Sequence, residues 1–531
     1  MSVFYLSLLP DTPKKGYWDY GILDFLFDGC PYEEVDSIPE EEFAIVVIPA
    51  RSHFKKVKEV NRELSNVKNC MLFLMGDEEG SFPLEKIKHP NIKIWVQNPK
   101  PELSDEYSKL GCGYPPKITE ARKLTNKSLD WFFAGQNTHE RREQCIDKLT
   151  HMDNGCLLET KGFTEGLEQE IYYSTMSKSK VVPCPSGPET VDTFRLYEAL
   201  ELGCIPIADS QTPKEDWSGF WEWLFEGPAP FPIVSDYDSL PGYIEECAKQ
   251  YPVLNNRIQA WWQRYKVNLV REIHKNISDL YFIPRPTPPV IVIPVSPIES
   301  HPEIDILMET IRSARYHFPQ SEIIATFDGV REEQEDMRRS YEEHIRRALW
   351  EFRFIGRVSP YIFDEHLHQS GMMKQIIDKI DSRYLIYLEQ DTPLVTDEPI
   401  DWDRLFEAIL SGESNVIRLH HEGVIPEEHN SMMIGDPENG LLKTAQWSQR
   451  PHIASTAFYK RILSENFSDK SKCFIEDLLH GKLHEAYILH GEMGWNQWRV
   501  HIYHPDGGNI KRSYNLDGRA GLQKYDESQI W

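Results

Sequence analysis

The chain has 531 residues, more than one hydrophobic core usually serves, and about two to four domains are therefore expected. Hydrophobic residues make up 40% and aromatic residues 12% of the sequence, which indicates an ordered globular protein rather than a disordered one. The formal net charge of −26 disfavours a polyanionic partner such as DNA, whose binding depends on Lys and Arg contacts with phosphate.

Cysteine usage and the N-terminus bear on the compartment. The nine cysteines form no CxxC pair and have no metal-type spacing, which is typical of reduced thiols in a cytosolic protein. The N-terminal MSVFYLSLLP has no basic segment before its short apolar run, so it is predicted to be a first strand rather than a signal peptide. No stretch approaches the ~18 apolar residues of a membrane span. A cytoplasmic protein is therefore expected, in a bacterium or, for a viral protein, in its host.

The first part of the chain alternates short apolar runs with amphipathic stretches. The runs lie at 43–50, 70–76, 91–97, 129–135, 180–185 and 204–208. Buried runs separated by helical segments indicate parallel sheets covered by helices. We therefore predict α/β architecture with two doubly wound, Rossmann-like halves, 1–115 and 116–283.

A proline-rich segment interrupts this pattern. The sequence IPRPTPP cannot donate a regular backbone ladder, so Pro284–Pro289 is the predicted linker. A new α/β pattern follows at once, with a strand from Val290, a helix at 304–318, a strand ending at Asp328 and another from Tyr384. Because this order is how a nucleotide-binding α/β domain opens, 290–531 is predicted to be a further α/β domain.

The first constellation lies between Ser177 and Ala208. A strand leads into a polar turn with Ser186 and Gly187, and a helix then opens at Asp192–Thr193. A helix N-terminus with free N–H groups suits a diphosphate. Arg195 and Glu198 share a helix face and could contact phosphate and ribose, or they could form an ordinary i,i+3 ion pair.

This run resembles the signature of the exostosin family. The matching elements are Ser179, Lys180, Cys184, Pro185, Arg195, Leu196, Glu198, Ala199, Gly203, Cys204, Ile205 and Pro206. A second matching stretch is WFFAGQNTHERR, Trp131–Arg142, which could otherwise be a solvated helix start. The resemblance implies a GT-B glycosyltransferase half, with the acceptor side in 1–115 and the donor side in 116–283. The donor-binding residues that it implies are Gly135, Arg141, Arg142, Lys180, Ser186, Gly187, Thr193, Arg195 and Glu198.

The second constellation is YLIYLEQDTPL. Glu389 and Asp391 are two apart where a predicted strand ends, so both carboxylates could face one hard cation. The pattern resembles the Asp-x-Asp motif of GT-A glycosyltransferases, with Glu at the first position. The resemblance, to family 2-like members, implies Mn²⁺ or Mg²⁺ on the donor diphosphate, with His504 as a late ligand.

Other residues of 290–531 resemble parts of the same fold. By this resemblance, three residues stand where such domains hold the nucleotide: Pro294, Ser296 and Asp328. The acidic pair Glu476 and Asp477 resembles the pair from which such enzymes take their general base, with Asp477 favoured. Isolated acidic or histidine residues are also commonly structural. The stretch TAQWSQRPHIAS is rich in groups that bind phosphate or stack on sugars, and the strand before His420 could bring further such groups to the same cleft. The stretch could instead be a packed loop. The candidate donor ligands there are Arg418 and Arg450.

Together these patterns predict a bifunctional glycosyltransferase, a hexosyl- or pentosyltransferase that uses nucleotide-sugar donors. The acceptor could be a glycan, a protein or a modified nucleotide. One alternative is a phage enzyme that glycosylates hydroxymethylated DNA bases, which the acidic net charge disfavours. Another is a sugar-nucleotide-binding protein in which one domain is inactive.

Overall fold

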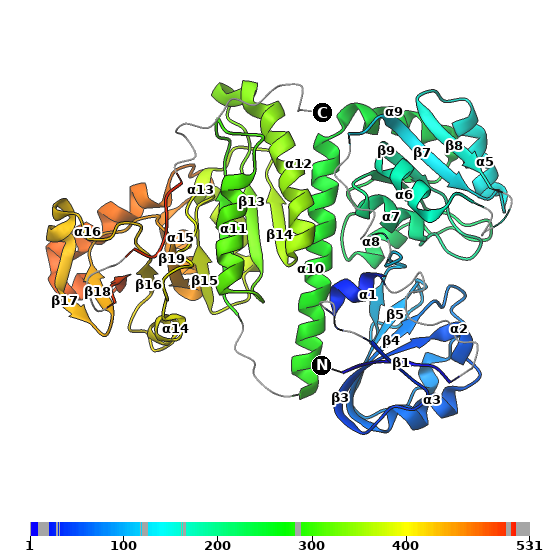
Figure 1. The fold of residues 1–531 in the computed structure, drawn as a ribbon, viewed down its shortest axis with the longest axis horizontal. Coiled ribbons are helices and arrows are strands. Elements are labelled where there is room, and N and C mark those ends of the chain that lie inside the picture. Colours follow the sequence, from blue (N-terminus) through cyan, green and yellow to red (C-terminus); the bar gives the residue numbers. More distant parts are fainter. Residues whose placement is uncertain are drawn as a thin grey trace. The chain divides into compact units, whose positions relative to one another are not determined.

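The computed structural model divides into two compact units, Met1–Arg285 (unit 1) and Pro286–Trp531 (unit 2). Figure 1 shows their helices and strands, and each unit is described by itself. The residues that the structure describes are 2–8, 21–27, 30, 32–116, 118, 126–160, 162, 166–281, 288–505 and 511–516. The predicted linker Pro284–Pro289 falls mostly outside these ranges.

The first sheet of unit 1 is parallel, with strand order β2-β1-β3-β4-β5-β6. Its strands are β1 (Val3–Leu6), β2 (Tyr32–Val35), β3 (Glu41–Pro49), β4 (Val67–Met75), β5 (Ile92–Gln97) and β6 (Ser108–Leu110). The helices of this half are α1 (Gly21–Leu26), α2 (Ala50–His53) and α3 (Val57–Leu64). The middle of β3, from Phe43 to Ile48, is buried on both sides, as expected for a parallel strand between two layers.

The second sheet of unit 1 is also parallel, with order β11-β10-β9-β7-β8. Its strands are β7 (Leu129–Gly135), β8 (Gly155–Glu159), β9 (Ser179–Cys184), β10 (Ile205–Asp209) and β11 (Ile233–Val234). The helices are α5 (Glu140–Thr150), α6 (Gln169–Ser177), α7 (Phe194–Glu201), α8 (Phe220–Leu224), α9 (Leu240–Gln250) and α10 (Val253–Tyr281). Strand β8 lies beside β7 on one side, and the next strand of the chain, β9, lies beside β7 on the other side. The topological switch point is therefore between β7 and β9.

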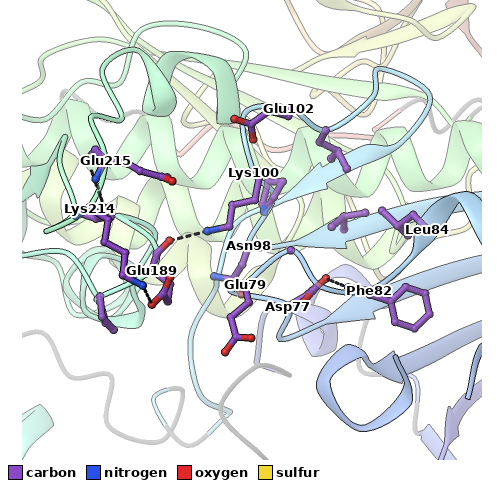
Figure 2. Close-up of a pocket in the computed structure, with 16 residues that line it drawn as sticks. Asp77, Glu79, Phe82, Leu84, Asn98, Lys100, Glu102, Glu189, Lys214 and Glu215 are labelled. Atoms are coloured by element: carbon purple, nitrogen blue, oxygen red, sulfur yellow. Dashed lines mark hydrogen bonds and ion pairs between the residues drawn. The ribbon is translucent and has the colours of Figure 1, made fainter. Parts of the chain in front are cut away.

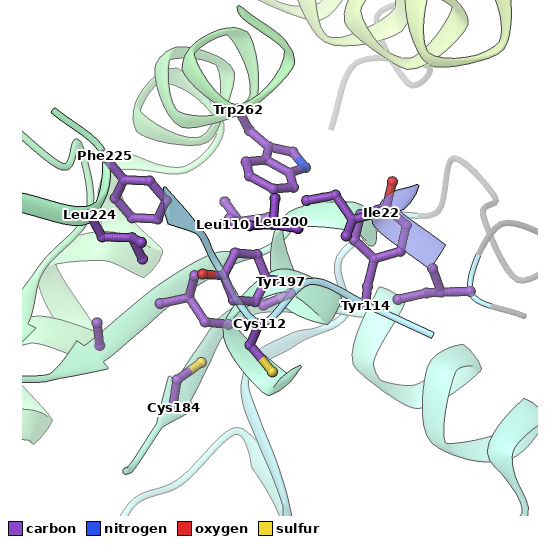
Figure 3. Close-up of a cluster of buried hydrophobic side chains, with 14 of the residues drawn as sticks. Ile22, Leu110, Cys112, Tyr114, Cys184, Tyr197, Leu200, Leu224, Phe225 and Trp262 are labelled. Carbon is purple, nitrogen blue, oxygen red and sulfur yellow. The ribbon is translucent and has the colours of Figure 1, made fainter. Parts of the chain in front are cut away.

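One hydrophobic core joins the two halves of unit 1. Figure 3 shows Ile22 and Tyr114 of the first half near Tyr197 of α7 and Trp262 of α10, all of them buried. At Gly111, a Cβ atom would lie 2.0 Å from the hydroxyl oxygen of Tyr197, so only glycine permits this contact. The long helix α10 contacts α1 and β4 as well as α7 and α9, which holds both sheets in one unit.

Unit 2 contains a mixed sheet of order β14-β13-β12-β15-β19-β16-β20-β18-β17. Its strands are β12 (Val290–Val295), β13 (Ile323–Phe327), β14 (Val358–Ile362), β15 (Tyr384–Tyr387), β16 (Val416–Arg418), β17 (Met433–Glu438), β18 (Leu441–Thr444), β19 (His452–Ser455) and β20 (Val500–Tyr503). Its helices are α11 (Asp305–His317), α12 (Arg338–Ile355), α13 (His368–Ile376), α14 (Trp402–Leu410), α15 (Thr456–Asn466) and α16 (Ile475–Trp495). Strands β12 to β15 are mutually parallel, and β19 enters the sheet antiparallel.

The predicted α/β class is confirmed in both units, with parallel sheets in unit 1 and a mixed sheet in unit 2. The predicted helix at 304–318 is α11, and the predicted strand from Val290 is β12. The strand expected from Tyr384 is shorter than its apolar run, because it ends at Tyr387 and a turn follows. Among the helices that the structure describes, none has the length and apolarity needed to cross a membrane.

Candidate functional site

The candidate site of unit 1 lies at the carboxyl ends of β7 and β9, at the switch point of the second sheet, where open α/β sheets commonly bind ligands. We call this place the crevice. Strand β7 ends at Gly135, and α5 begins directly after His139. Strand β9 ends at Cys184, two residues before Ser186, and α7 begins after Thr193. Two helix N-termini therefore meet at one edge of the sheet, where partial positive charge attracts anions.

Two arginines face this crevice. Arg195 donates from Nη2 to the carbonyl oxygen of Ala134 at 2.7 Å, and Arg142 donates to the carbonyl oxygens of Gln136 and Ser186 at 3.4 Å each. Neither arginine forms an ion pair with a carboxylate of the described residues. Burial and the neighbouring charge of Arg195 lower the pKa of Arg142 to about 10. Two arginine side chains thus meet here, and the described residues supply an ion-pair partner to neither of them.

Several polar atoms around the arginines are buried and lack hydrogen-bond partners among the described residues. They are His139 Nδ1, Ser186 Oγ, Thr193 Oγ1 and Arg195 Nε. Leaving one such group unsatisfied costs about 1–3 kcal/mol, so native proteins rarely gather several without a ligand or water. Their position beside two arginines and two helix N-termini fits an anion with several oxygen atoms.

Gly135 brings the backbone of β7 close to Arg195. A Cβ atom at this position would lie 2.7 Å from Arg195 Nη2, which is closer than non-bonded atoms approach. Any larger residue would displace the guanidinium. The glycine predicted from the sequence therefore leaves room for Arg195 in the crevice.

Glu198 does not form the i,i+3 ion pair with Arg195. Its carboxylate instead accepts hydrogen bonds from the hydroxyls of Tyr172 at 2.9 Å and Tyr173 at 3.3 Å. Glu198 is 5% exposed, and burial raises the pKa of its carboxyl group. Both carboxylate oxygens have partners within the protein, so Glu198 is better suited to positioning Tyr172 than to receiving a ribose.

Two residues that the sequence resemblance placed at the donor have other partners. Arg141 forms a buried ion pair with Asp209 and also donates to the carbonyl oxygen of Ser235 at 3.1 Å. Lys180 pairs with Asp130 at 2.8 Å near the start of β9, at the edge opposite to Ser186. Gly187 closes the intervening turn by donating to the Thr190 carbonyl oxygen at 2.8 Å.

A cavity of about 460 Å³ lies between loops of the two halves of unit 1 (Figure 2). The first half supplies the loops after β4 and β5, including Asp77 and Lys100, and the second half supplies Glu189 and 212–215. Lys100 Nζ donates to the carbonyl oxygen of Glu189 at 2.6 Å across this space. Glu189 and Ser186 belong to the same connection between β9 and α7.

Asp192 ties the two halves of unit 1 together. Its carboxylate accepts from the backbone N–H of Cys112 in the first half at 2.8 Å and from the hydroxyl of Tyr197 at 2.7 Å. Burial raises the pKa of Asp192 to about 7. Sequence patterns did not reveal these contacts of Asp192, or those of His139 and Tyr172, because they depend on partners far away in the chain.

In unit 2, β12 and β15 flank the switch point of the sheet. Ser296 follows β12 and exchanges two hydrogen bonds with the side chain of Gln390, at 3.3 and 3.4 Å. Pro294 lies inside β12 and is buried. Asp328 is fully engaged: it accepts from the backbone of Gly329, Leu367 and His368, and its Oδ2 lies 2.8 Å from His366 Nδ1. Asp328 thus anchors a loop and has no oxygen left for a nucleotide.

The residues predicted to bind a divalent cation do not gather into one group. Glu389 and Asp391 belong to a turn rather than a strand, and Gln369 donates to Glu389 Oε1 at 2.7 Å. His504 follows β20, three strands from β15 and so roughly 14 Å away at ~4.8 Å per strand. No set of three or more His, Cys, Asp or Glu ligands occurs within the described part of the chain. The geometry therefore does not fit the predicted ligand set.

The other predicted residues of unit 2 lie around β16 and β19. Arg450 pairs with Glu422 at 3.2 Å and contacts His420 Nε2 at 2.8 Å. Glu476 accepts from the backbone N–H of Gln449 at 2.8 Å, whereas the neighbouring Asp477 is exposed at the start of α16. Arg418 is the last residue of β16 and is 1% exposed.

No family model and no curated protein sequence matches this chain. Among solved structures, the chain is similar to residues 1–349 of S. aureus TarS, with 12% identity over 43% of this chain and a TM-score of 0.28. A UDP-glucose pyrophosphorylase has 13% identity over 44% of this chain and 94% of its own length, with a TM-score of 0.28. HddC from Yersinia pseudotuberculosis has 14% identity over 35% of this chain and 82% of its own, with a TM-score of 0.23. The chain spans 60% of the TarS fragment. Likeness of this extent does not assign a function, so the interpretation rests on the site itself.

Proposed function

We propose that unit 1 is a glycosyltransferase half that binds a nucleotide-sugar donor by its diphosphate in the crevice between α5 and α7. The observation that carries this proposal is that Arg142 and Arg195, which form no ion pair with the described residues, lie at a switch point beside buried hydroxyls that lack partners among those residues. A diphosphate supplies several anionic oxygens, which matches this set of donors. An ordinary structural ion pair would have supplied a carboxylate instead.

Transfer of a sugar leaves negative charge on the departing diphosphate. Fixed cations and helix N-termini stabilise such charge without reorganisation during the reaction. In unit 1, Arg195 would contact one phosphate beside Gly135, while Arg142 and the hydroxyls of Ser186 and Thr193 would contact the others. Glu198 would hold Tyr172 beside Arg195 and so fix the guanidinium. This chemistry needs no divalent cation in unit 1.

The cavity between the two halves is the proposed acceptor site of unit 1. Its lining contains the carboxylates of Asp77, Glu79, Glu102, Glu189 and Glu215. Only Lys100 and Lys214 balance them among the described lining residues, and Lys214 pairs with Glu189. A polyanionic acceptor would meet repulsion here, which favours a neutral glycan or other polyol over nucleic acid.

For unit 2 we propose a second nucleotide-sugar site beside Ser296 and Gln390, which would make the chain bifunctional. The support is the position of these residues at the switch point between β12 and β15. The described carboxylates do not form the cation site expected from the sequence, so no step of this proposal depends on a metal.

A donor screen tests the proposal. Uridine, guanosine and adenosine diphosphate sugars would be added singly to the full chain, and unfolding midpoints and release of free sugar would be recorded. A ligand present at 100 times its Kd stabilises its domain by about 2.7 kcal/mol. We expect at least one donor to stabilise unit 1 in the intact protein but not in the Arg142→Gln, Arg195→Gln double variant. Stabilisation without sugar release would favour the binding-protein alternative, and no stabilisation by any nucleotide sugar would refute the proposal.

A further inference from the structure

A row of three buried polar side chains crosses the sheet of unit 2. Tyr387 of β15 is paired with His452 of β19, and His452 is paired on its other side with Arg418 of β16. Residues directly opposite each other on neighbouring strands lie on the same face of a sheet. The three side chains are therefore neighbours, and the rings of Tyr387 and His452 stack with centroids 5.1 Å apart.

Each member of the row has a buried polar atom without a hydrogen-bond partner among the residues that the structure describes. These atoms are Tyr387 Oη, His452 Nε2, and both Nε and Nη2 of Arg418. The Nη1 atom of Arg418 donates to the carbonyl oxygen of Gln446 at 3.2 Å and to its side-chain oxygen at 3.0 Å. The edge of the guanidinium formed by Nε and Nη2 therefore remains available for a ligand. Arginine can bind two oxygens of one oxyanion with this edge.

No carboxylate in the described part of unit 2 forms an ion pair with Arg418, although the charges of Glu476 and Glu422 act on it. The nearby carboxylates have other partners: Glu422 pairs with Arg450, and Glu476 accepts from the backbone of Gln449. Burial and the charge of Arg450 lower the pKa of Arg418 to about 9. A buried cation without a counter-ion is costly, which is why such groups are rare unless they serve a ligand.

The hydrogen-bonding capacity of His452 narrows the class of ligand. His452 Nδ1 lies 2.8 Å from the carbonyl oxygen of Arg450, so this nitrogen carries the proton of the neutral imidazole. Nε2 is then an acceptor. A ligand that fills the row must offer two oxygens to Arg418 and a hydroxyl hydrogen to His452.

We propose that unit 2 binds a hydroxyl-bearing oxyanion, a hydrogen phosphate or a hydroxy-carboxylate, on Arg418, His452 and Tyr387 without a divalent cation. The row lies at the carboxyl ends of β15 and β16, the edge of an α/β sheet where ligands bind. The Arg418 guanidinium takes the charge, Tyr387 donates a further hydrogen bond and His452 accepts from the ligand. This inference does not rest on the donor site proposed for unit 1.

Calorimetric titration of the full chain tests this site. The Arg195→Gln variant serves as the parent, so that the crevice of unit 1 contributes little. Inorganic phosphate, glucuronate and sulfate are titrated separately, at constant ionic strength and with a chelator present. We expect phosphate or glucuronate to bind, and the one that binds identifies the source of the oxyanion. Sulfate has no hydroxyl for His452, and we expect its affinity to be at least roughly tenfold weaker than that of phosphate.

Two further variants separate ligand binding from structure. Arg418→Met replaces the buried cation by an apolar side chain of similar length, and we expect it to abolish binding without lowering the unfolding midpoint of unit 2. Tyr387→Phe removes only the unpartnered hydroxyl and should weaken binding roughly three- to tenfold. The proposal is overturned if neither anion binds, if binding requires added magnesium, or if both variants bind like the parent. A lower midpoint in Arg418→Met with unchanged binding would likewise show that Arg418 serves the fold.

Discussion

Replacing Arg195 by glutamine gives the sharpest test of the crevice in unit 1. The guanidinium donates to the carbonyl oxygen of Ala134 at 2.7 Å, lies 4.6 Å from the ring centroid of Phe133 and interacts with the side chain of Tyr172, and it forms no ion pair with a carboxylate of the described residues. Its loss should therefore lower the free energy of unfolding by about 1–2 kcal/mol. A charged hydrogen bond to a ligand contributes about 1.5–3 kcal/mol, so the Kd for a nucleoside diphosphate should rise roughly 10- to 150-fold.

The assay is isothermal titration of the full chain with the nucleoside diphosphate that gives the largest thermal shift, together with chemical unfolding of each variant. Lys180→Gln is the matched control, because it removes a cation from the opposite end of the same sheet. Its ion pair with Asp130 is partly exposed, and breaking it should cost at most about 1 kcal/mol of stability and leave the affinity unchanged. Equal affinities for wild type and Arg195→Gln, or equal losses in the two variants, would refute the assignment of the crevice.

Three further predictions concern the surroundings of this crevice. Gly135→Ala places a Cβ atom 2.7 Å from Arg195 Nη2 and should displace the guanidinium without unfolding the protein. The Kd for the nucleoside diphosphate should therefore rise at least roughly threefold. An unchanged Kd would contradict this contact. Arg141→Gln leaves the buried Asp209 without its cation and should lower the free energy of unfolding by about 3–5 kcal/mol, which chemical denaturation measures; a change below about 1 kcal/mol would be inconsistent with the buried pair. The carboxyl group of Asp192 has a pKa of about 7 in the folded protein, above the ~3.9 of an unfolded chain. Between these values the folded protein binds a proton that the unfolded chain has lost, so unit 1 should lose stability as the pH rises from about 4 through 7. Unfolding midpoints across this range should show a smaller slope in Asp192→Asn, and an identical slope would argue against the titration of this carboxyl.

The elements around the crevice could be predicted because local signals specify them. The apolar run at 180–185, the polar turn at Ser186 and the helix after Thr193 follow one another without a long insertion, and periodicity identifies each. The partners within the crevice could not be predicted in the same way. Arg141 and Arg142 are adjacent in the sequence, but only the arrangement of β10 places Asp209 beside Arg141 and leaves Arg142 in the crevice.

Unit 2 illustrates a different limit of sequence reasoning. The spacing of Glu389 and Asp391 predicts a shared direction only if the strand continues, and the strand ends at Tyr387. The row of Tyr387, His452 and Arg418 depends on the pairing of three strands that are distant in the sequence. The pairing register of distant strands cannot be predicted from the local sequence. A slip of one residue would turn every side chain of a strand to the other face of the sheet.

A crystal structure of the full chain with the nucleoside diphosphate selected by the donor screen would test the crevice most directly. We expect the diphosphate to lie between the N-termini of α5 and α7, with its oxygens within hydrogen-bonding distance of Arg142, Arg195, Ser186 Oγ and Thr193 Oγ1. A diphosphate bound elsewhere in unit 1, with Arg142 and Arg195 still donating to backbone carbonyl oxygens, would contradict the proposed site.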